Sequence, residues 1–145
     1  MGRDQWRNVS TSLEALGWSM VVASKLGWHA IPTAKNSAGP DLLLVSKSGS
    51  RPRTLQVKGT RNSVVPLGKA ASLRLSDYVV IFDLRPLGGR NGGSPPISHA
   101  ATPKGATRSV SRYYGEDDST GSLWLPEKYW SLWKPLEDVI GRGDR

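Results

Sequence analysis

The sequence contains no cysteine and only two histidines among its 145 residues. Without cysteine, a disulfide scaffold, a thiol nucleophile and a thiolate metal site are all excluded. The two histidines, His29 and His99, also argue against a zinc site built on imidazole ligands. The chain is therefore expected to work without thiol or zinc chemistry.

Long hydrophobic runs are also missing. The apolar runs at 42–45 and 78–82 are far shorter than the roughly 20 residues that span a bilayer. No N-terminal stretch combines a basic start, an apolar run and a small-residue cleavage site. With 37% hydrophobic and 22% charged residues, the chain is expected to form one globular domain over residues 1–145, soluble and cytoplasmic, with no membrane partner.

Acidic residues are scarce in the first half of the chain. Residues 1–75 hold 11 Lys and Arg against three carboxylates, whereas residues 76–145 hold nine of each sign. The whole formal charge of +8 therefore comes from the first half. Such a concentration is typical of a face that binds a polyanion such as nucleic acid. The competing interpretation is that a basic composition merely keeps a small domain soluble.

Hydrophobic periodicity predicts an α/β domain. Apolar residues that recur every three or four positions predict a helix from Ser10 or Ser12 to about Leu26, which Gly27 ends. The members of this apolar stripe are Val9, Leu13, Leu16, Met20 and either Val21 or Ala23. Aromatic and β-branched runs bounded by turn residues predict strands at 28–33, 41–47, 53–59 and 78–84, with a hairpin connection at 48–52.

The second half of the sequence is less regular. Residues 85–106 are rich in glycine, proline and serine and predict a mobile loop that holds at most one short strand, at 97–101. A helix of one or two turns is expected at 107–114, and a C-terminal helix within 123–140 whose aromatic side chains cover the core. With the segment 73–77 left open as an optional helix, the order α-β-β-β-(α)-β predicts a mixed β-sheet flanked by helices.

Polar side chains gather on one face of the predicted hairpin. Gln56 and Lys58 are two residues apart on a strand, so both side chains leave the same face. If the hairpin closes about Gly49–Ser50, Asp41 lies opposite Lys58 and diagonal to Gln56 on that face. The aliphatic residues that would point into the core are Leu42, Leu44, Leu55 and Val57. A carboxylate, an amide oxygen and an ammonium are thus expected within side-chain reach of one another.

This set of groups suits metal-assisted attack on a phosphodiester. Mg²⁺ prefers oxygen ligands and keeps several waters, so Asp41 and the amide oxygen of Gln56 can hold it, with Mn²⁺ as a substitute. The metal lowers the pKa of a bound water and offsets charge on the transition-state phosphate. Lys58 can orient or deprotonate that water, or stabilise the phosphate electrostatically.

Pro40-Asp41, followed by Gln56-Val57-Lys58, resembles the motif of the PD-(D/E)XK nuclease superfamily in the variant where glutamine replaces the acid. The resemblance covers about residues 9–84 and extends to Holliday-junction resolvases and restriction-endonuclease-like proteins. It implies a restriction-endonuclease-like core, with the motif on the second and third strands. It also implies a further acidic residue on the first helix, where Glu14 is the sole acid. Because Gln56 is neutral, it binds metal more weakly than the usual carboxylate.

The resemblance assigns catalytic roles to Asp41, Gln56, Lys58 and Glu14, and metal binding to Asp41, Gln56 and Glu14. Contacts with DNA or with the cleft are expected from Lys35, Asn36, Ser37, Arg53, Thr60 and Arg61. Each residue has an ordinary alternative. Asp41 could be a turn residue, Glu14 a solvated helix position and Lys58 a side chain at a sheet edge, with the others as loop or solvated surface residues.

The sequence therefore predicts a metal-dependent endonuclease that hydrolyses DNA phosphodiester bonds with Mg²⁺. The alternative is a weak or inactive relative that binds nucleic acid through the same basic face. A homodimer would place two active sites for cleavage of both strands, but no segment of the sequence identifies an interface.

Overall fold

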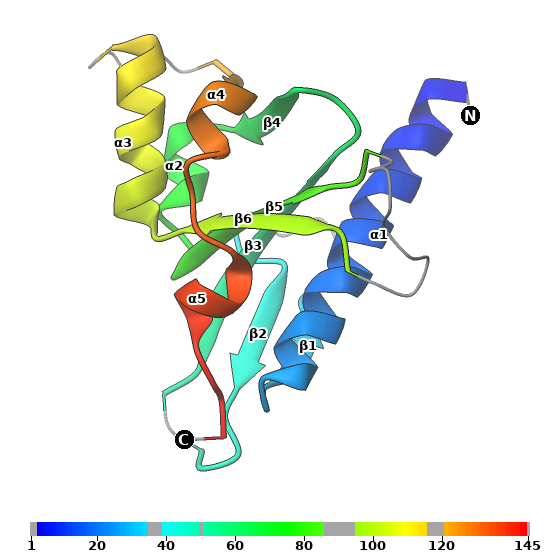
Figure 1. Ribbon diagram of the computed structural model, residues 1–145, viewed down its shortest axis with the longest axis vertical. Coiled ribbons are helices and arrows are strands. Elements are labelled where there is room, and N and C mark those ends of the chain that lie inside the picture. Colours follow the sequence, from blue (N-terminus) through cyan, green and yellow to red (C-terminus); the bar gives the residue numbers. More distant parts are fainter. Residues whose placement is uncertain (1–2, 35–38, 50, 86–94, 116–120, 145) are drawn as a thin grey trace.

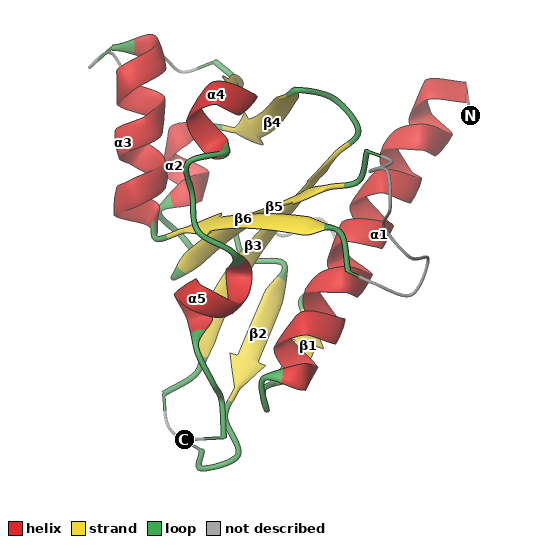
Figure 2. Cartoon of the chain, in the orientation of Figure 1, coloured by secondary structure: helices red, strands yellow, loops and turns green. Residues whose placement is uncertain are grey.

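The computed structural model describes residues 3–34, 39–49, 51–85, 95–115 and 121–144 (Figure 1). Its elements in chain order are α1 (Arg3–Lys25), β1 (His29–Pro32), β2 (Leu42–Val45), β3 (Arg53–Thr60), β4 (Val64–Gly68), α2 (Ala70–Leu73), β5 (Tyr78–Asp83), β6 (Ile97–Ala101), α3 (Pro103–Tyr114), β7 (Leu123–Pro126), α4 (Glu127–Trp130) and α5 (Leu136–Ile140). One mixed sheet has the strand order β1-β2-β3-β5-β6, and β4 pairs with β7 in a small antiparallel sheet. The predicted mixed sheet flanked by helices is confirmed (Figure 2).

Strand β5 lies inside the main sheet, parallel to β3 and antiparallel to β6. All of its residues after Tyr78 are buried, because both faces of the sheet are covered. Helices α1 and α5 pack on the face that carries Val80 and Phe82. The small sheet and helices α2, α3 and α4 cover the other face, over Val79 and Ile81. The molecule therefore has two hydrophobic cores that share one sheet.

Helix α1 rests on the sheet through small residues. Ala15, Ser19 and Ala23 are spaced four apart and are fully buried. The exposed large residues of the predicted apolar stripe are Val9, Leu13 and Val21. The buried face of α1 is thus offset from the predicted one, because α1 lies very close to β3. If Gly59 carried a Cβ atom, that atom would lie only 2.8 Å from the Ala15 Cβ. Large side chains do not fit in that contact.

The predicted strands are confirmed, whereas the start of α1 and the region after β3 differ from expectation. Strands β1, β2, β3 and β5 lie within two residues of their predicted bounds. Helix α1 begins at Arg3, well before Ser10 or Ser12, and ends before Gly27, whose φ is +89°. Strand β4 was not predicted, and the optional helix left open at 73–77 forms earlier in the chain, as α2. In β4, Val65 and Leu67 are buried, whereas Val64 and Pro66 are exposed. Proline is rare inside strands, so Pro66 makes this alternation hard to recognise in the sequence.

The second half of the chain is more regular than predicted. Residues 97–101 form the expected strand, β6, but α3 already begins at Pro103, inside the range 85–106 that was predicted as a mobile loop. Helix α3 begins there because Thr102 caps it: its Oγ1 accepts a hydrogen bond from the Gly105 N–H over 3.2 Å. Residues 86–94 lie outside the described residues.

The single C-terminal helix predicted within 123–140 is wrong. Pro126 and Pro135 divide this segment into β7, α4 and α5, because proline cannot continue a helix. Trp130 is fully buried, in line with a core role, but Trp124 is 53% exposed. None of the helices in the described part of the chain is both long and apolar enough to cross a membrane.

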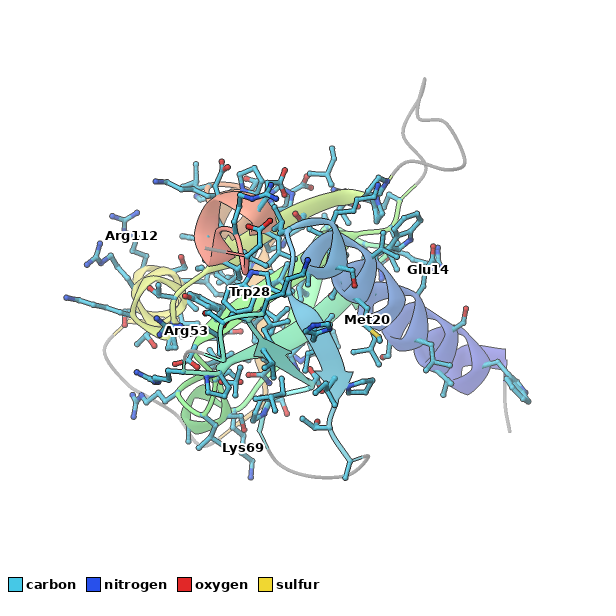
Figure 3. All side chains as sticks on the ribbon, turned by 90° about the horizontal axis from the view of Figure 1, so that it is seen from below. Glu14, Met20, Trp28, Arg53, Lys69 and Arg112 are labelled. Carbon is cyan, nitrogen blue, oxygen red and sulfur yellow. The ribbon has the colours of Figure 1, made fainter. Side chains whose placement is uncertain are left out.

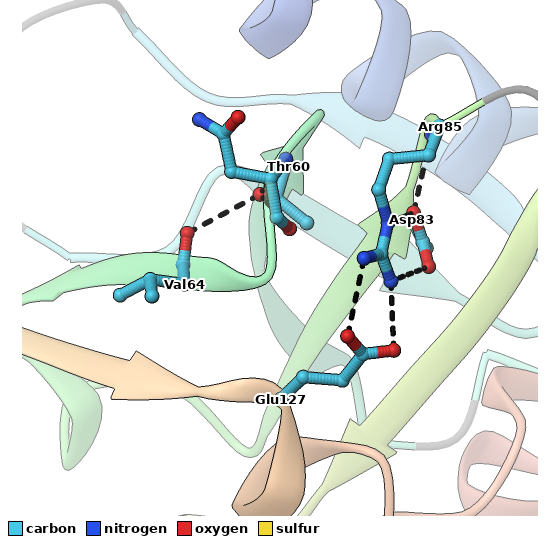
Figure 4. A network of polar contacts seen from close by, with 6 residues as sticks. Thr60, Val64, Asp83, Arg85 and Glu127 are labelled. Carbon is cyan, nitrogen blue, oxygen red and sulfur yellow. Dashed lines mark hydrogen bonds and ion pairs between the residues drawn. The ribbon is translucent and has the colours of Figure 1, made fainter.

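An arginine joins the two sheets at the end of β5 (Figure 4). Arg85 Nη2 donates to Asp83 Oδ2 and to Glu127 Oε1, both over 2.7 Å, so one guanidinium ties β5 to the junction of β7 and α4. Burial by itself raises the pKa of the Asp83 carboxyl, but hydrogen bonds from Arg85 outweigh this effect and lower the pKa. The interior carboxylate thus stays ionised because Arg85 pairs with it.

Replacing Arg85 with leucine is expected to lower the free energy of unfolding by about 3 kcal/mol, because the buried Asp83 carboxylate loses its partner. Urea unfolding measures the effect. Arg51→Leu is the control: Arg51 pairs with Asp77 through a side chain that is 73% exposed, so its loss should cost about 0.5 kcal/mol or less.

The effect of Arg85→Leu should also depend on pH. The pKa of Asp83 is lower in the folded chain than in the unfolded chain, so the pair stabilises the fold above the ordinary aspartate pKa. This stabilisation is lost as the pH falls through the lowered pKa. If the difference in the free energy of unfolding between wild type and Arg85→Leu stayed constant as the pH fell, the lowered pKa of Asp83 would be contradicted.

Candidate active site

Asp41 immediately precedes β2 and closes its pairing with β3. The Asp41 N–H donates to the Leu55 carbonyl over 2.9 Å, and Asp41 Oδ2 accepts from the Val57 N–H over 2.7 Å. The backbone of β3 therefore fixes the carboxylate in place. Within the described residues Oδ1 carries no hydrogen bond, so it is open to a further ligand.

The register of the hairpin differs by two residues from the predicted one. Leu42 pairs with Leu55, which puts Asp41 opposite Gln56 and not opposite Lys58. The difference arises because the connecting turn closes earlier than predicted. Side chains alternate between the two faces of a strand, so a shift of two residues keeps each on its predicted face. Asp41, Gln56 and Lys58 therefore share a face, as expected.

Lys58 lies half-buried at the edge of a cavity of about 490 Å³. Burial lowers the pKa of the Lys58 ammonium, and the negative charge of Asp41 opposes this effect only in part. The residues that line the cavity are Ser12, Leu13, Leu16, Asp41, Val57, Lys58, Gly59, Pro66 and Gly68. A lysine with a lowered pKa beside a carboxylate in a cavity is typical of a catalytic site. A cavity of similar volume between α1 and α5 is lined mainly by aliphatic and proline side chains and offers little for catalysis.

The oxygen of the Gln56 side chain is buried without a hydrogen-bond donor. The residue is only 5% exposed, and Oε1 has no partner in the described part of the chain. Buried amide oxygens without a partner are rare and costly, and Gln56 is not among the residues that line the cavity. Asp41 Oδ1 and Gln56 Oε1 are both oxygens of the kind that Mg²⁺ prefers as ligands, and the two residues lie opposite each other on the hairpin. Across the described ranges, no three His, Asp or Glu side chains gather as a metal site.

Glu14 does not join Asp41 at the cavity. Its Oε2 forms an ion pair with Arg61 Nη2. The residues of α1 that line the cavity are Ser12, Leu13 and Leu16, which lie before and after Glu14 in the sequence. Ala15 faces the sheet, so Glu14 points to the flank of β3, where Arg61 follows the end of the strand. Glu14 is not among the residues that line the cavity, and its role as a catalytic residue and metal ligand stays a prediction.

The six residues predicted to contact DNA differ in their surroundings, and their contacts with DNA stay predictions. Residues 35–37 lie outside the described residues. Thr60 is buried, and its hydroxyl hydrogen-bonds to the carbonyls of Asn62 and Val64, so it stabilises the turn after β3 (Figure 4). Arg61 is engaged by Glu14. Arg53 begins β3, five residues before Lys58 and so roughly 16 Å from it along the strand.

Part of the cavity wall was not predicted from the sequence. Ser12 lies on α1 beside the predicted apolar stripe, and Pro66 and Gly68 belong to β4. A local pattern can indicate that β4 is a strand, but not that the chain turns back over β3 to bring it to the cavity. The wall therefore depends on tertiary structure.

The fold has counterparts among solved structures. A Holliday junction resolvase from Archaeoglobus fulgidus, an archaeal hyperthermophile, is similar with a TM-score of 0.60 and 14% identity, over 92% of this chain and 98% of the resolvase. A bacterial homing endonuclease is similar with a TM-score of 0.45 and 13% identity, over 88% of this chain and 81% of its own. No protein-family model and no curated protein matches the sequence. The chain has the restriction-endonuclease-like fold of the archaeal resolvase.

Proposed function

We propose that this protein hydrolyses DNA phosphodiester bonds at the cavity beside Asp41, Gln56 and Lys58, with the help of a divalent metal ion. One observation carries the proposal: Lys58, half-buried and with a lowered pKa, shares a face with a carboxylate that the backbone of β3 holds in place. The likeness to a Holliday junction resolvase supports it by analogy of fold. The formal charge of +8 is consistent with a polyanionic substrate.

The donor atoms fit Mg²⁺, with Mn²⁺ as a substitute. Asp41 Oδ1 and Gln56 Oε1 would hold the ion, because neither has a hydrogen-bond partner in the described residues. When bound, the ion acts as a Lewis acid that lowers the pKa of a water and neutralises charge on the phosphate. With one carboxylate in this set, binding should be weak until phosphate oxygens of the substrate complete the coordination.

The residues of the chain divide the remaining work. Lys58 Nζ takes the proton of the attacking water, because a lowered pKa makes its neutral form available nearer to neutral pH. The Val57 N–H keeps the Asp41 carboxylate in one orientation. Leu13 and Leu16 form an apolar wall of the cavity and exclude part of the bulk water.

The direct test is incubation with supercoiled, linear, single-stranded and branched DNA in Mg²⁺, Mn²⁺ or EDTA. We expect metal-dependent nicking that EDTA abolishes. A protein that binds these DNAs but cleaves none of them would instead support the alternative, an inactive relative that binds nucleic acid. Gln56 in place of a second carboxylate is the observation that favours this alternative.

Replacing Gln56 with glutamate is expected to tighten Mn²⁺ binding by about tenfold, because the ligand set gains a second negative charge. Without metal, the same change should lower the melting temperature, because it buries a carboxylate that has no donor. Calorimetric titration with Mn²⁺ and melting curves with and without metal measure both effects. Gln56→Met, which removes the oxygen, is the matched control and should bind Mn²⁺ more weakly than wild type. Equal Mn²⁺ affinity in all three proteins would place the metal elsewhere.

The proposal extends to the assembly and the location of the protein. Cleavage of both strands of a duplex needs two active sites, which a homodimer would provide, and we place its action in the cytoplasm. Light scattering on the purified protein, with and without DNA, measures the mass of the species that cleaves.

A further inference from the structure

Helix α3 carries a row of cations on its outer face. Lys104, Arg108 and Arg112 are spaced four residues apart, so they follow one side of the helix, and all three are exposed. The opposite side is fixed against the core, where Ala106 and Val110 are buried. We call Lys104, Arg108 and Arg112 the α3 stripe.

Of the α3 stripe, only Arg112, in the last turn, is placed to stabilise the helix through its dipole. Like charges four residues apart repel one another and destabilise a helix, and α3 contains no acidic residue to balance them. Within the described residues, the three side chains form no hydrogen bond or ion pair. The stripe is therefore available to an external anion.

One exposed cation, Lys69, lies between the candidate active site and α3. Gly68 lines the cavity, and the next residue, Lys69, is exposed at the start of α2. Helix α2 is in contact with α3. Figure 3 shows Lys69 and Arg112 toward the α2–α3 side of the molecule and Glu14 toward the α1 side. A strand of nucleic acid that leaves the cavity past Lys69 would next meet α3.

We propose that the α3 stripe binds the phosphate backbone of double-stranded DNA beyond the phosphate that is cleaved in the cavity; this inference rests on the proposed function. Successive cations of the stripe are about 6 Å apart along the helix, close to the roughly 7 Å that two nucleotides of one strand rise along the duplex axis. A membrane surface is the poorer partner, because a helix that binds lipid needs its apolar face free. The apolar face of α3 is buried. The favoured substrate is thus DNA whose duplex extends well past the cleavage point.

The test compares two triple variants of the full chain that lose the same charge. The stripe variant is Lys104→Gln, Arg108→Gln and Arg112→Gln. The control variant is Lys25→Gln, Lys47→Gln and Lys134→Gln, three exposed cations at the end of α1, after β2 and before α5. Fluorescence anisotropy over a range of salt measures the affinity of each protein for a duplex of about 8 and one of about 40 base pairs. Circular dichroism confirms that each variant is folded.

We expect the stripe variant to bind the long duplex at least tenfold more weakly, with a salt slope that is smaller by about 2 to 3. Its affinity for the short duplex and its nicking rate on it should stay within about twofold of wild type, because the cavity is unchanged. The control variant should change much less on the long duplex. Equal effects of both triple variants, or no effect of the stripe variant, would overturn the inference.

The outcomes for the stripe and for catalysis can be separated. A protein that never cleaves DNA, yet binds the long duplex through the stripe, would overturn the proposed hydrolysis and support the stripe. If wild type cleaves DNA but the stripe variant binds the long duplex as tightly as wild type, the proposed hydrolysis would be supported and the role of the stripe overturned. Binding of wild type to phosphatidylserine vesicles but not to DNA would overturn both.

Discussion

Replacing Asp41 with asparagine should lower the rate of metal-dependent cleavage by about a thousandfold while DNA binding persists. The change removes the only carboxylate among the residues that line the cavity in the described part of the chain. Asparagine has the same shape, and its oxygen can still accept the Val57 N–H, so the hairpin should keep its register. Affinity for DNA measured in EDTA should hold or rise, because a negative charge near the phosphate is lost. Initial nicking rates at saturating Mg²⁺ measure the effect.

Asp77→Asn is the matched control for Asp41→Asn. The Asp77 carboxylate also accepts a backbone N–H of β3, from Thr54 over 2.9 Å, but at the other end of the strand. Its replacement should leave cleavage within about twofold of wild type. Glu14→Gln should also retain cleavage, because Glu14 pairs with Arg61. If Glu14→Gln lost as much activity as Asp41→Asn, Glu14 would be supported as a metal ligand.

The shared face of the candidate site could be predicted from the sequence even though its register could not. The side chains of Gln56 and Lys58 leave one face by strand geometry alone. The pairing of Asp41 depends on where the turn closes. The turn closes between Ser46 and Gly49, where the Gly49 N–H donates to the Ser46 carbonyl over 3.2 Å, and not about Gly49–Ser50. The earlier turn moves the partner of Asp41 from Lys58 to Gln56, two residues away, so Asp41 stays on the predicted face of the hairpin.

The position of Glu14 could not be predicted, because helical periodicity alone does not identify which side of α1 meets the sheet. The sequence offers a stripe of large apolar residues, but the close contact of α1 with Gly59 selects Ala15 and its small neighbours. Glu14, next to Ala15, then pairs with Arg61 and is not among the residues that line the cavity. Contacts between segments far apart in the chain decide this, and no local pattern records them.

Counting charge along the chain also misses where the basic surface lies. Residues 76–145 are neutral in sum, yet they contain the α3 stripe. The sum conceals the stripe because the acids of that half lie outside α3. Among them, Asp83 and Glu127 hold Arg85, and Asp144 holds Arg142. In the first half, by contrast, Arg61 is engaged by Glu14. Exposed and unpaired charge, which depends on the fold, is the better guide to a phosphate-binding surface.

Replacing Lys58 with methionine is expected to reduce cleavage by about 10² to 10⁴-fold, the range typical of a lost general base. The variant should be no less stable than wild type. The pKa of Lys58 is lower in the folded chain than in the unfolded chain, so the unfolded chain binds more protons between the two values. Lys58 therefore lowers the free energy of unfolding as the pH falls, and methionine, which does not titrate, removes this loss of stability. Thermal melts at several pH values measure stability, and nicking assays measure the rate.

The pH dependence of the rate distinguishes a base from an electrostatic role for Lys58. If the neutral amine takes the proton of the water, the rate of the wild-type protein rises with pH to the lowered pKa of Lys58 and then levels off. Lys58→Arg keeps the positive charge but cannot lose its proton, so it should be as inactive as Lys58→Met. Substantial activity in Lys58→Arg, with a wild-type rate that falls above the pKa, would show that the ammonium stabilises the phosphate instead. Asp41→Asn links the two groups: the charge of Asp41 raises the pKa of Lys58, so its loss should move the residual pH profile toward lower pH.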